Sequence, residues 1–221
     1  MKKLIVLFSV CLLVFGMIGV AGAVSINYLH NNPVIDPNQF ISPYPGVITE
    51  DFEGSLPWTW TGNFAVLLGD VSGVASAPFG ESAKDTSLYV SVPQNVSNSP
   101  QSVTVTNLGG SYNYFGIWWG SVDTYNTLSF YSGINLVASF TGSDITNPNS
   151  ANGNQVAPST NLYVNFLDLP SFDSFKMTST SYAFEADNIA VGNVVPEPAT
   201  LLLLGSGLIG LAGFARRRFK R

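Results

Sequence analysis

The segment that decides the fold reads Tyr112-Asn113-Tyr114-Phe115-Gly116-Ile117-Trp118-Trp119-Gly120. Aromatic and branched residues at this density are typical of a β-strand, in which neighbouring side chains point to opposite faces. If Trp118 enters the core, Trp119 therefore faces away from it, or the reverse. An outward tryptophan near Asp123 and Tyr125 would form a platform on which a sugar ring stacks, whereas a tryptophan covered by a loop or by the N-terminal arm would only add to the packing. The sequence leaves both interpretations open.

Short alternating apolar segments continue on both sides of this stretch, separated by Gly, Pro, Ser, Thr and Asn. No long helical period appears between the two ends of the chain. The pattern predicts an all-β fold, a two-layer antiparallel β-sandwich of the jelly-roll type, because about ten short strands with turn residues between them fit such a sandwich. The expected strands are residues 47–53, 64–68, 87–92, 102–106, 112–119, 127–131, 135–140, 162–166, 174–178 and 183–191.

Two segments stand apart from the predicted strands. Residues 24–46 are polar, contain four prolines and are expected to form an N-terminal arm over the domain surface. Residues 147–158, rich in Asn, Ser, Gly and Pro, are expected to be the longest loop. The β-sandwich domain is therefore expected to span residues 47–194, and the exported part is long enough for one domain with a sizeable core.

The two ends of the predicted domain carry short acidic motifs, Asp51-Phe52-Glu53-Gly54 and Phe184-Glu185-Ala186-Asp187-Asn188. These segments resemble the first and last strands of carbohydrate-binding-module-like jelly rolls. The resemblance implies that the two strands pair and hold a structural Ca²⁺ ion through Glu53 and Asp187, with backbone carbonyls completing the oxygen shell. Strand alternation then places Phe52 and Ala186 on the core side. The competing interpretation, in which the acids simply face water, stays open.

Residues 1–23 have the organisation of a secretory signal peptide. Lys2 and Lys3 precede an apolar run over residues 4–20, and Ala21-Gly22-Ala23 supplies small residues for cleavage after Ala23. The only cysteine, Cys11, lies inside this segment. The exported chain therefore has no disulfide and must be held together by core packing or by a metal.

The chain ends in three consecutive features typical of a sorting signal, residues 195–221. The first is Val195-Pro196-Glu197-Pro198, whose prolines keep the chain extended and accessible. The second is an uncharged run of 17 residues, 199–215, which as a transmembrane helix would reach about 26 Å, close to the thickness of the hydrocarbon core. The third is a basic tail of Arg216, Arg217, Arg218, Lys220 and Arg221. By the positive-inside bias this tail stays in the cytoplasm and residues 24–195 lie outside.

The order of these features resembles the tail of the PEP-CTERM family of bacterial proteins. The resemblance implies that an exosortase, a membrane enzyme, recognises the tail, removes it, and releases or anchors the protein at the cell surface. The protein would be held at the inner membrane in transit and then act at the cell surface or outside the cell. This resemblance concerns the delivery of the chain rather than its molecular role.

The exported part is strongly acidic. Lys84 and Lys176 are its only basic residues, against thirteen of the fourteen acids of the chain, since Glu197 lies in the tail, and the net charge is −11. A chain without arginine and with this charge is not expected to bind nucleic acid or an anionic membrane surface. Divalent cations are its natural small partners, although most of the acids are expected only to keep a surface protein soluble.

Catalytic constellations are missing from the exported sequence. The only histidine, His30, lies in the proline-rich arm, and no cysteine or arginine remains, so serine triads, cysteine nucleophiles and zinc sites lack their parts. Thirteen acids offer many carboxylate pairs, but no spacing singles one out as the pair of a glycoside hydrolase. We therefore expect a non-catalytic cell-surface or extracellular-matrix protein associated with extracellular polysaccharide, as in a biofilm. The alternative is a carbohydrate-binding module that uses an aromatic platform within residues 112–125.

Overall fold

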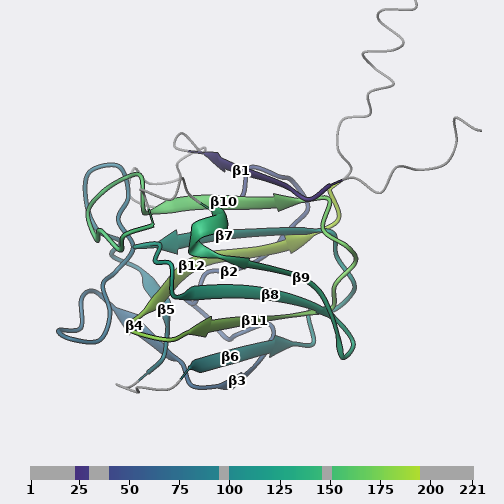
Figure 1. Ribbon diagram of the computed structural model, residues 1–221, viewed down its shortest axis with the longest axis horizontal. Coiled ribbons are helices and arrows are strands. Elements are labelled where there is room, and N and C mark those ends of the chain that lie inside the picture. The colour runs from purple at the N-terminus through teal and green to yellow at the C-terminus, as the bar shows by residue number, and fades with distance from the viewer. Residues whose placement is uncertain (1–22, 30–39, 95–99, 146–150, 195–221) are drawn as a thin grey trace, which may run out of the picture.

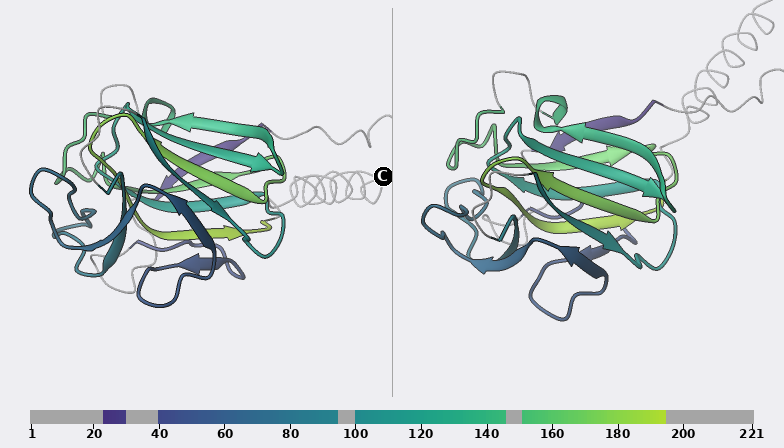
Figure 2. Two further views of the ribbon diagram at one scale, coloured as in Figure 1. Left: turned by 90° about the horizontal axis from the view of Figure 1, so that it is seen from below. Right: turned by 60° about the horizontal axis from the view of Figure 1, so that its bottom comes forward.

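The computed structural model describes residues 23–29, 40–94, 100–145 and 151–194. These residues form two antiparallel β-sheets that lie face to face, one of seven strands and one of five (Figure 1, Figure 2). The only helix in this part of the chain is the single turn α2 (Gly142–Ile145). The predicted all-β, two-layer antiparallel sandwich is therefore confirmed. The expected signal helix and transmembrane helix lie outside the described residues.

The larger sheet has the strand order β1-β10-β7-β12-β5-β4, and β2 also pairs with β12. β12 pairs with β7 along one of its edges. Along its other edge it pairs with two short strands, with β5 through residues 184–186 and with β2 through residues 189–191. The strands of this sheet are β1 (Ser25–Leu29), β2 (Ile48–Glu50), β4 (Ala65–Leu68), β5 (Leu88–Val92), β7 (Tyr114–Gly120), β10 (Leu162–Leu167) and β12 (Phe184–Gly192).

The smaller sheet has the order β3-β6-β11-β8-β9, again antiparallel throughout. A bulge between Phe130 and Tyr131 shifts the register of the β8–β9 hairpin. The strands of this sheet are β3 (Thr59–Gly62), β6 (Gln101–Thr106), β8 (Asn126–Ser132), β9 (Asn135–Thr141) and β11 (Ser174–Ser179).

Each of the ten predicted segments overlaps one of these strands, with ends that differ by a few residues, but β1 and β3 were not predicted. The sequence predicts an arm that only lies over the surface, whereas its first residues form β1 and pair with β10 from Ser25 opposite Leu167 to Leu29 opposite Tyr163. The first residues of the arm, Ser25–Leu29, are therefore part of the sandwich. The segment is short, and its alternation of Ile26 and Tyr28 with Ser25 and Asn27 is weak evidence for a strand beside a proline-rich stretch.

The core between the sheets contains a cluster of phenylalanine rings packed among valine and other aliphatic side chains. Phe115 of β7 lies at the centre, with its ring centroid 5.0 Å from that of Phe130 and 4.9 Å from that of Phe175, both edge to face. Fully burying such a side chain contributes about 1.5–3 kcal/mol, and favourable ring geometry adds about 0.5–1.5 kcal/mol for each pair. Packing of this kind can hold an exported domain together without disulfides.

The two framing segments meet as expected, because β2 pairs with β12 and Glu50 lies opposite Ile189. Phe52 and Ala186 both belong to the buried core, as strand alternation predicts. A register shift interrupts the pairing of β12 with β7 between Asp187 and Ala190, and Asn188 takes a positive φ of 48° there. This bulge lies at the point where β12 changes partner from β5 to β2.

Candidate functional site

The outer face of the larger sheet carries two acidic side chains of β12. Phe184 and Ala186 point into the core, so Glu185 and Asp187 point to the opposite face. Both carboxylates are nevertheless buried, with 2% and 1% of their surface exposed. They are covered by the loop of residues 69–87, which bonds to both of them. Carboxylates on an outer sheet face would ordinarily meet water, and here they do not.

The N-terminal arm covers the neighbouring part of the same face. The Phe40 ring packs edge to face on Trp118 with a centroid distance of 5.3 Å, and the two form a second buried cluster with Tyr163. Ser42 bonds the Tyr114 hydroxyl at 2.7 Å. Gly116 is required beneath this layer, because a Cβ atom there would collide with the hydroxyl groups of Tyr114 and Tyr163. The outer face is thus a second packed layer.

The aromatic platform is the sequence hypothesis that the structure overturns. Trp118 and Trp119 do point to opposite faces, but neither has any exposed surface. Trp119 stacks on Phe184 in the main core at a centroid distance of 4.2 Å, and Trp118 lies under Phe40. Asp123 and Tyr125 are half-buried, and the Tyr125 hydroxyl donates to the carbonyl oxygen of Tyr182. These four residues do not form an exposed sugar-binding surface.

Glu53 and Asp187, the predicted calcium ligands, border one cavity of about 290 Å³. Asp51, Ser87 and Asn188 also line it, so the cavity lies where the segment after β2 meets β12. Glu53 is exposed, and its Oε1 atom accepts a hydrogen bond from the Leu88 amide at 2.6 Å. The structure therefore brings the two predicted residues to one place, one at the rim and one buried.

Asp85 is a further acid that sequence reasoning missed; it does not line this cavity but is linked to Asp187 through the Ser87 hydroxyl. It is 2% exposed, and the Ser87 hydroxyl bonds its Oδ1 atom and lies 3.4 Å from Oδ2 of Asp187. Its other oxygen, Oδ2, is buried without a hydrogen-bond partner among the described residues. Burial raises the pKa of Asp187 well above its usual value, and the neighbouring Asp85 raises that pKa further. Two buried carboxylates without a positively charged side chain beside them need a proton or a cation.

The oxygen atoms around this cavity fit a hard cation. Ca²⁺ accepts carboxylate, carbonyl and hydroxyl oxygens together, and these are the groups that Asp187, Asp85 and Ser87 present. Across the residues that the structure describes, no group of three or more acidic, histidine or cysteine side chains is arranged around a common metal position. The site therefore offers carboxylates in pairs, and backbone or hydroxyl oxygens must supply the remainder of a calcium shell.

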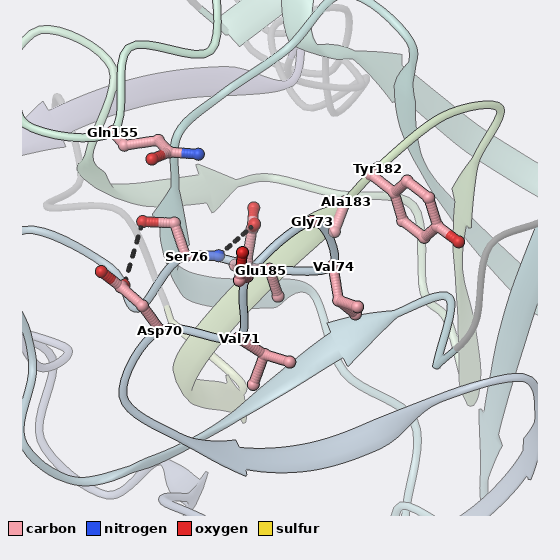
Figure 3. Close-up of a pocket in the computed structure, with 11 residues that line it drawn as sticks. Asp70, Val71, Gly73, Val74, Ser76, Gln155, Tyr182, Ala183 and Glu185 are labelled. Atoms are coloured by element: carbon pink, nitrogen blue, oxygen red, sulfur yellow. Dashed lines mark hydrogen bonds between the residues drawn. The ribbon is translucent and has the colours of Figure 1, made fainter.

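Glu185 borders a second cavity of about 510 Å³, formed largely by residues 70–76 (Figure 3). Its Oε1 atom accepts a hydrogen bond from the Ser76 amide at 3.0 Å and its Oε2 atom one from the Ser121 hydroxyl at 2.9 Å. Burial raises the pKa of Glu185 to about 7, although these two hydrogen bonds lower it. Glu185 therefore titrates near neutral pH while tying the loop to the sheet.

The last described residue, Val194, is held by a side chain of the connection between β6 and β7. The Asn113 amide nitrogen donates to the Val194 carbonyl at 3.1 Å, and the Val194 amide donates to the Asn113 side-chain oxygen at 2.9 Å. Asn193 donates to the carbonyl oxygen of Ser111 at 3.2 Å. The chain is thus fixed to the domain up to Val194, two positions before the Pro-Glu-Pro triplet.

Comparison with protein-family models gives one match, described as the PEP-CTERM protein-sorting motif, over residues 194–218. The chain carries a PEP-CTERM sorting signal. No curated protein sequence matches the chain. The sorting signal accounts for the terminal residues alone, and the sandwich before it has to be interpreted from its own geometry.

The PEP-CTERM signal means that the chain is exported, processed by an exosortase at the membrane, and displayed at the cell surface or released. Its motif residues Val195 to Pro198, the apolar run 199–215 and the basic tail lie outside the described residues, as does most of the predicted signal peptide. Within the described ranges, no helix is long and apolar enough to cross a membrane. The membrane-spanning segment, residues 199–215, therefore stays a prediction from the sequence.

One pair in the exported domain, Ser76 and Lys84, has the elements of a serine nucleophile and a base. The Lys84 ammonium lies 2.7 Å from the Ser76 hydroxyl. Lys84 also forms an ion pair with both oxygens of Asp70, at 2.8 and 2.7 Å. The Lys84 ammonium donates hydrogen bonds to both Asp70 and Ser76, so it faces the hydroxyl as a donor rather than as a base. The pair has the character of a loop staple.

Proposed function

We propose that this chain is a non-catalytic protein of the cell surface or extracellular matrix, associated with extracellular polysaccharide. The observation that carries the proposal is the junction at Val194. There the sorting signal begins directly after β12, and β12 lies between β7 on one side and β5 and β2 on the other in the larger sheet. A signal for delivery is joined to a densely packed domain, with no linker that would suit an independently moving catalytic unit.

The state of the reactive side chains supports a non-catalytic role. Lys84 forms an ion pair with Asp70. Both oxygens of Glu185 already accept hydrogen bonds from the protein. Trp118 and Trp119 are used for packing. Each of these groups stabilises the sandwich and its covering loop, so the described residues offer no free pair of nucleophile and base.

The charge of the exported part supports a polysaccharide partner rather than an anionic polymer. With two lysines against thirteen acids, the domain is repelled by phosphate-rich partners. Sugar hydroxyls, in contrast, accept and donate hydrogen bonds with exposed Asp, Asn, Ser and Thr side chains. Because the tryptophans are covered, contacts with polysaccharide would be polar and weak at each sugar, and many sugars along a polymer would have to contribute.

Calcium is proposed as a structural ion of this domain, held where the segment after β2 meets β12. Asp187 and Asp85 would supply buried carboxylate oxygens, and Glu53 would close the site from the rim. A cation there would neutralise two buried charges and connect the loop of residues 69–87 to β12, which no disulfide can do in this chain. The support is the orphaned Oδ2 atom of Asp85 beside the raised pKa of Asp187.

The polysaccharide association can be tested by comparing cells that make their extracellular polysaccharide with cells that cannot. We expect the mature protein in the matrix fraction of the first and in the culture medium of the second. Equal distribution in both strains would contradict the association. Release of new reducing ends from the isolated polysaccharide by the purified protein, lost in the Glu185→Gln variant, would contradict the non-catalytic role.

A further inference from the structure

Asn113 is the side chain that fixes the start of the sorting signal to the folded domain. Its amide group makes two hydrogen bonds with the backbone of Val194, one as donor and one as acceptor. Its own backbone is held as well, since the Asn113 amide donates to the Gly192 carbonyl and the Leu169 amide donates to the Asn113 carbonyl. The clamp is therefore part of the sandwich rather than of a loose terminus.

The clamp lies at the end of the sandwich toward which β6, β10 and β12 all run (Figure 1). Backbone hydrogen bonds join the loops at this end, from Tyr112 to Phe172 and from Asp173 to Tyr131. The Gly133 amide adds a bond to the Asp173 carboxylate at 2.9 Å. The sorting signal thus leaves from a rigid surface made of three connected loops.

The distance from this surface to the apolar run of the tail is short. Four residues, 195–198, separate Val194 from Ala199. A fully extended chain advances by at most about 3.6 Å per residue, so the two positions are at most about 18 Å apart. Pro196 and Pro198 favour an extended backbone and leave little slack in this connection. The clamped end of the domain must therefore stay close to the membrane until the tail is removed.

We propose that Asn113 is a positioning residue for processing by the exosortase. By fixing Val194 to the domain, it holds residues 195–198 between a rigid surface and the membrane in which the enzyme resides. A segment with both ends fixed loses less freedom on entering an active site than a free one, and it stays at a high local concentration. The folded domain presents its own sorting motif.

The test follows processing of the full-length chain in cells that carry an exosortase, by pulse labelling and the ratio of precursor to mature protein. Asn113→Ala is expected to slow processing on the order of fivefold, because backbone order at Val194 is lost. Asn63→Ala is the matched control. Asn63 also makes two hydrogen bonds through its side-chain amide, to Gln101 and Gln94, at the opposite end of the sandwich. The control variant is expected to be processed at the wild-type rate.

A second set of variants separates positioning from stability. Inserting Gly-Ser-Gly-Ser between Val194 and Val195 leaves the domain unchanged and should slow processing as Asn113→Ala does. In the inserted background, Asn113→Ala should have no further effect, because the clamp no longer limits the reach of the motif. Wild-type or faster processing of the insertion variant would overturn the proposal. Equal slowing by Asn113→Ala with and without the insertion would also overturn it, since Asn113 would then act through stability alone.

Discussion

Glu185 and Asp187 lie two positions apart on β12, point to the same outer face of the sheet, and are both buried. Strand alternation puts them on one face, and the loop of residues 69–87 covers both. Each pKa is raised above its usual value, first of all by burial. The outer face of the larger sheet therefore holds two buried carboxyl groups, and the fold accommodates them when they are protonated or paired with a cation.

Stability should fall as pH rises through the range in which Glu185 loses its proton. Its pKa is about 7 in the folded state against 4.5 ordinarily, so between these values the folded protein binds more protons than the unfolded chain. This difference in proton binding lowers the free energy of unfolding by on the order of 3 kcal/mol from pH 4.5 to pH 7 and above. Thermal melts of the purified exported protein measure it. Glu185→Gln should flatten this dependence, whereas Glu81→Gln, at an exposed position, should keep it. An unchanged profile in Glu185→Gln would assign the dependence to other groups.

Calcium should raise the melting temperature of the exported protein above that measured with a chelator. At a hundred times its dissociation constant, a ligand that binds only the folded state adds about 2.7 kcal/mol. Asp187→Asn and Asp85→Asn should abolish the shift, while Glu53→Gln, at the rim, should reduce it. The effect should weaken toward acid pH, because protonation of Asp187 competes with the cation. A calcium shift that persists in both aspartate variants would place the ion elsewhere.

Phe40→Ala should destabilise the protein by about 3 kcal/mol, the usual cost of truncating a buried phenylalanine. Phe40 is the arm residue that covers Trp118, so the emission of that tryptophan should shift to longer wavelength in the folded variant. Denaturant unfolding followed by fluorescence measures both effects. Ile134→Ala is the control, since Ile134 is 96% exposed. A small effect of Phe40→Ala would mean that the arm only rests on the domain.

Substitutions in the sorting motif should block delivery without affecting the fold. Glu197→Gln and Pro196→Ala each change the Pro-Glu-Pro triplet that precedes the apolar run. We expect both full-length variants to accumulate unprocessed in the membrane fraction, with the same resistance to protease as the parent domain. Immunoblots of fractionated cells show this directly. Normal maturation of both variants would contradict recognition of this motif.

The strands could be predicted because their alternation is local. The run around Trp118 and the segment that ends in Asp187 contain enough apolar and turn residues to fix the strand and its two faces. The pairing of the two framing segments, observed as β2 with β12, was also predicted, from a resemblance rather than from pattern. Cover of one tryptophan by the N-terminal arm was one of two interpretations left open, and the sequence could not decide between them because Phe40 lies far from Trp118 in the chain.

Asp85 and β1 are two further features that could not be predicted from the sequence. Asp85 lies in a loop without periodicity, and only the folding of residues 69–87 over β12 brings it to Asp187. β1 is an edge strand whose partner, β10, follows more than a hundred residues later. Long-range contacts of this kind leave no local signal, so the composition of the cation site and the place of the arm required the structure.

The central claim is that a separable sorting signal delivers a folded domain that keeps its structure after the signal is removed. Intact-mass measurement of the protein isolated from the surface or medium of the cells that produce it tests this most directly. We predict a folded species that starts at Val24 and lacks the apolar run and the arginine cluster, residues 199–221. A surface protein whose mass still includes those residues would contradict the claim.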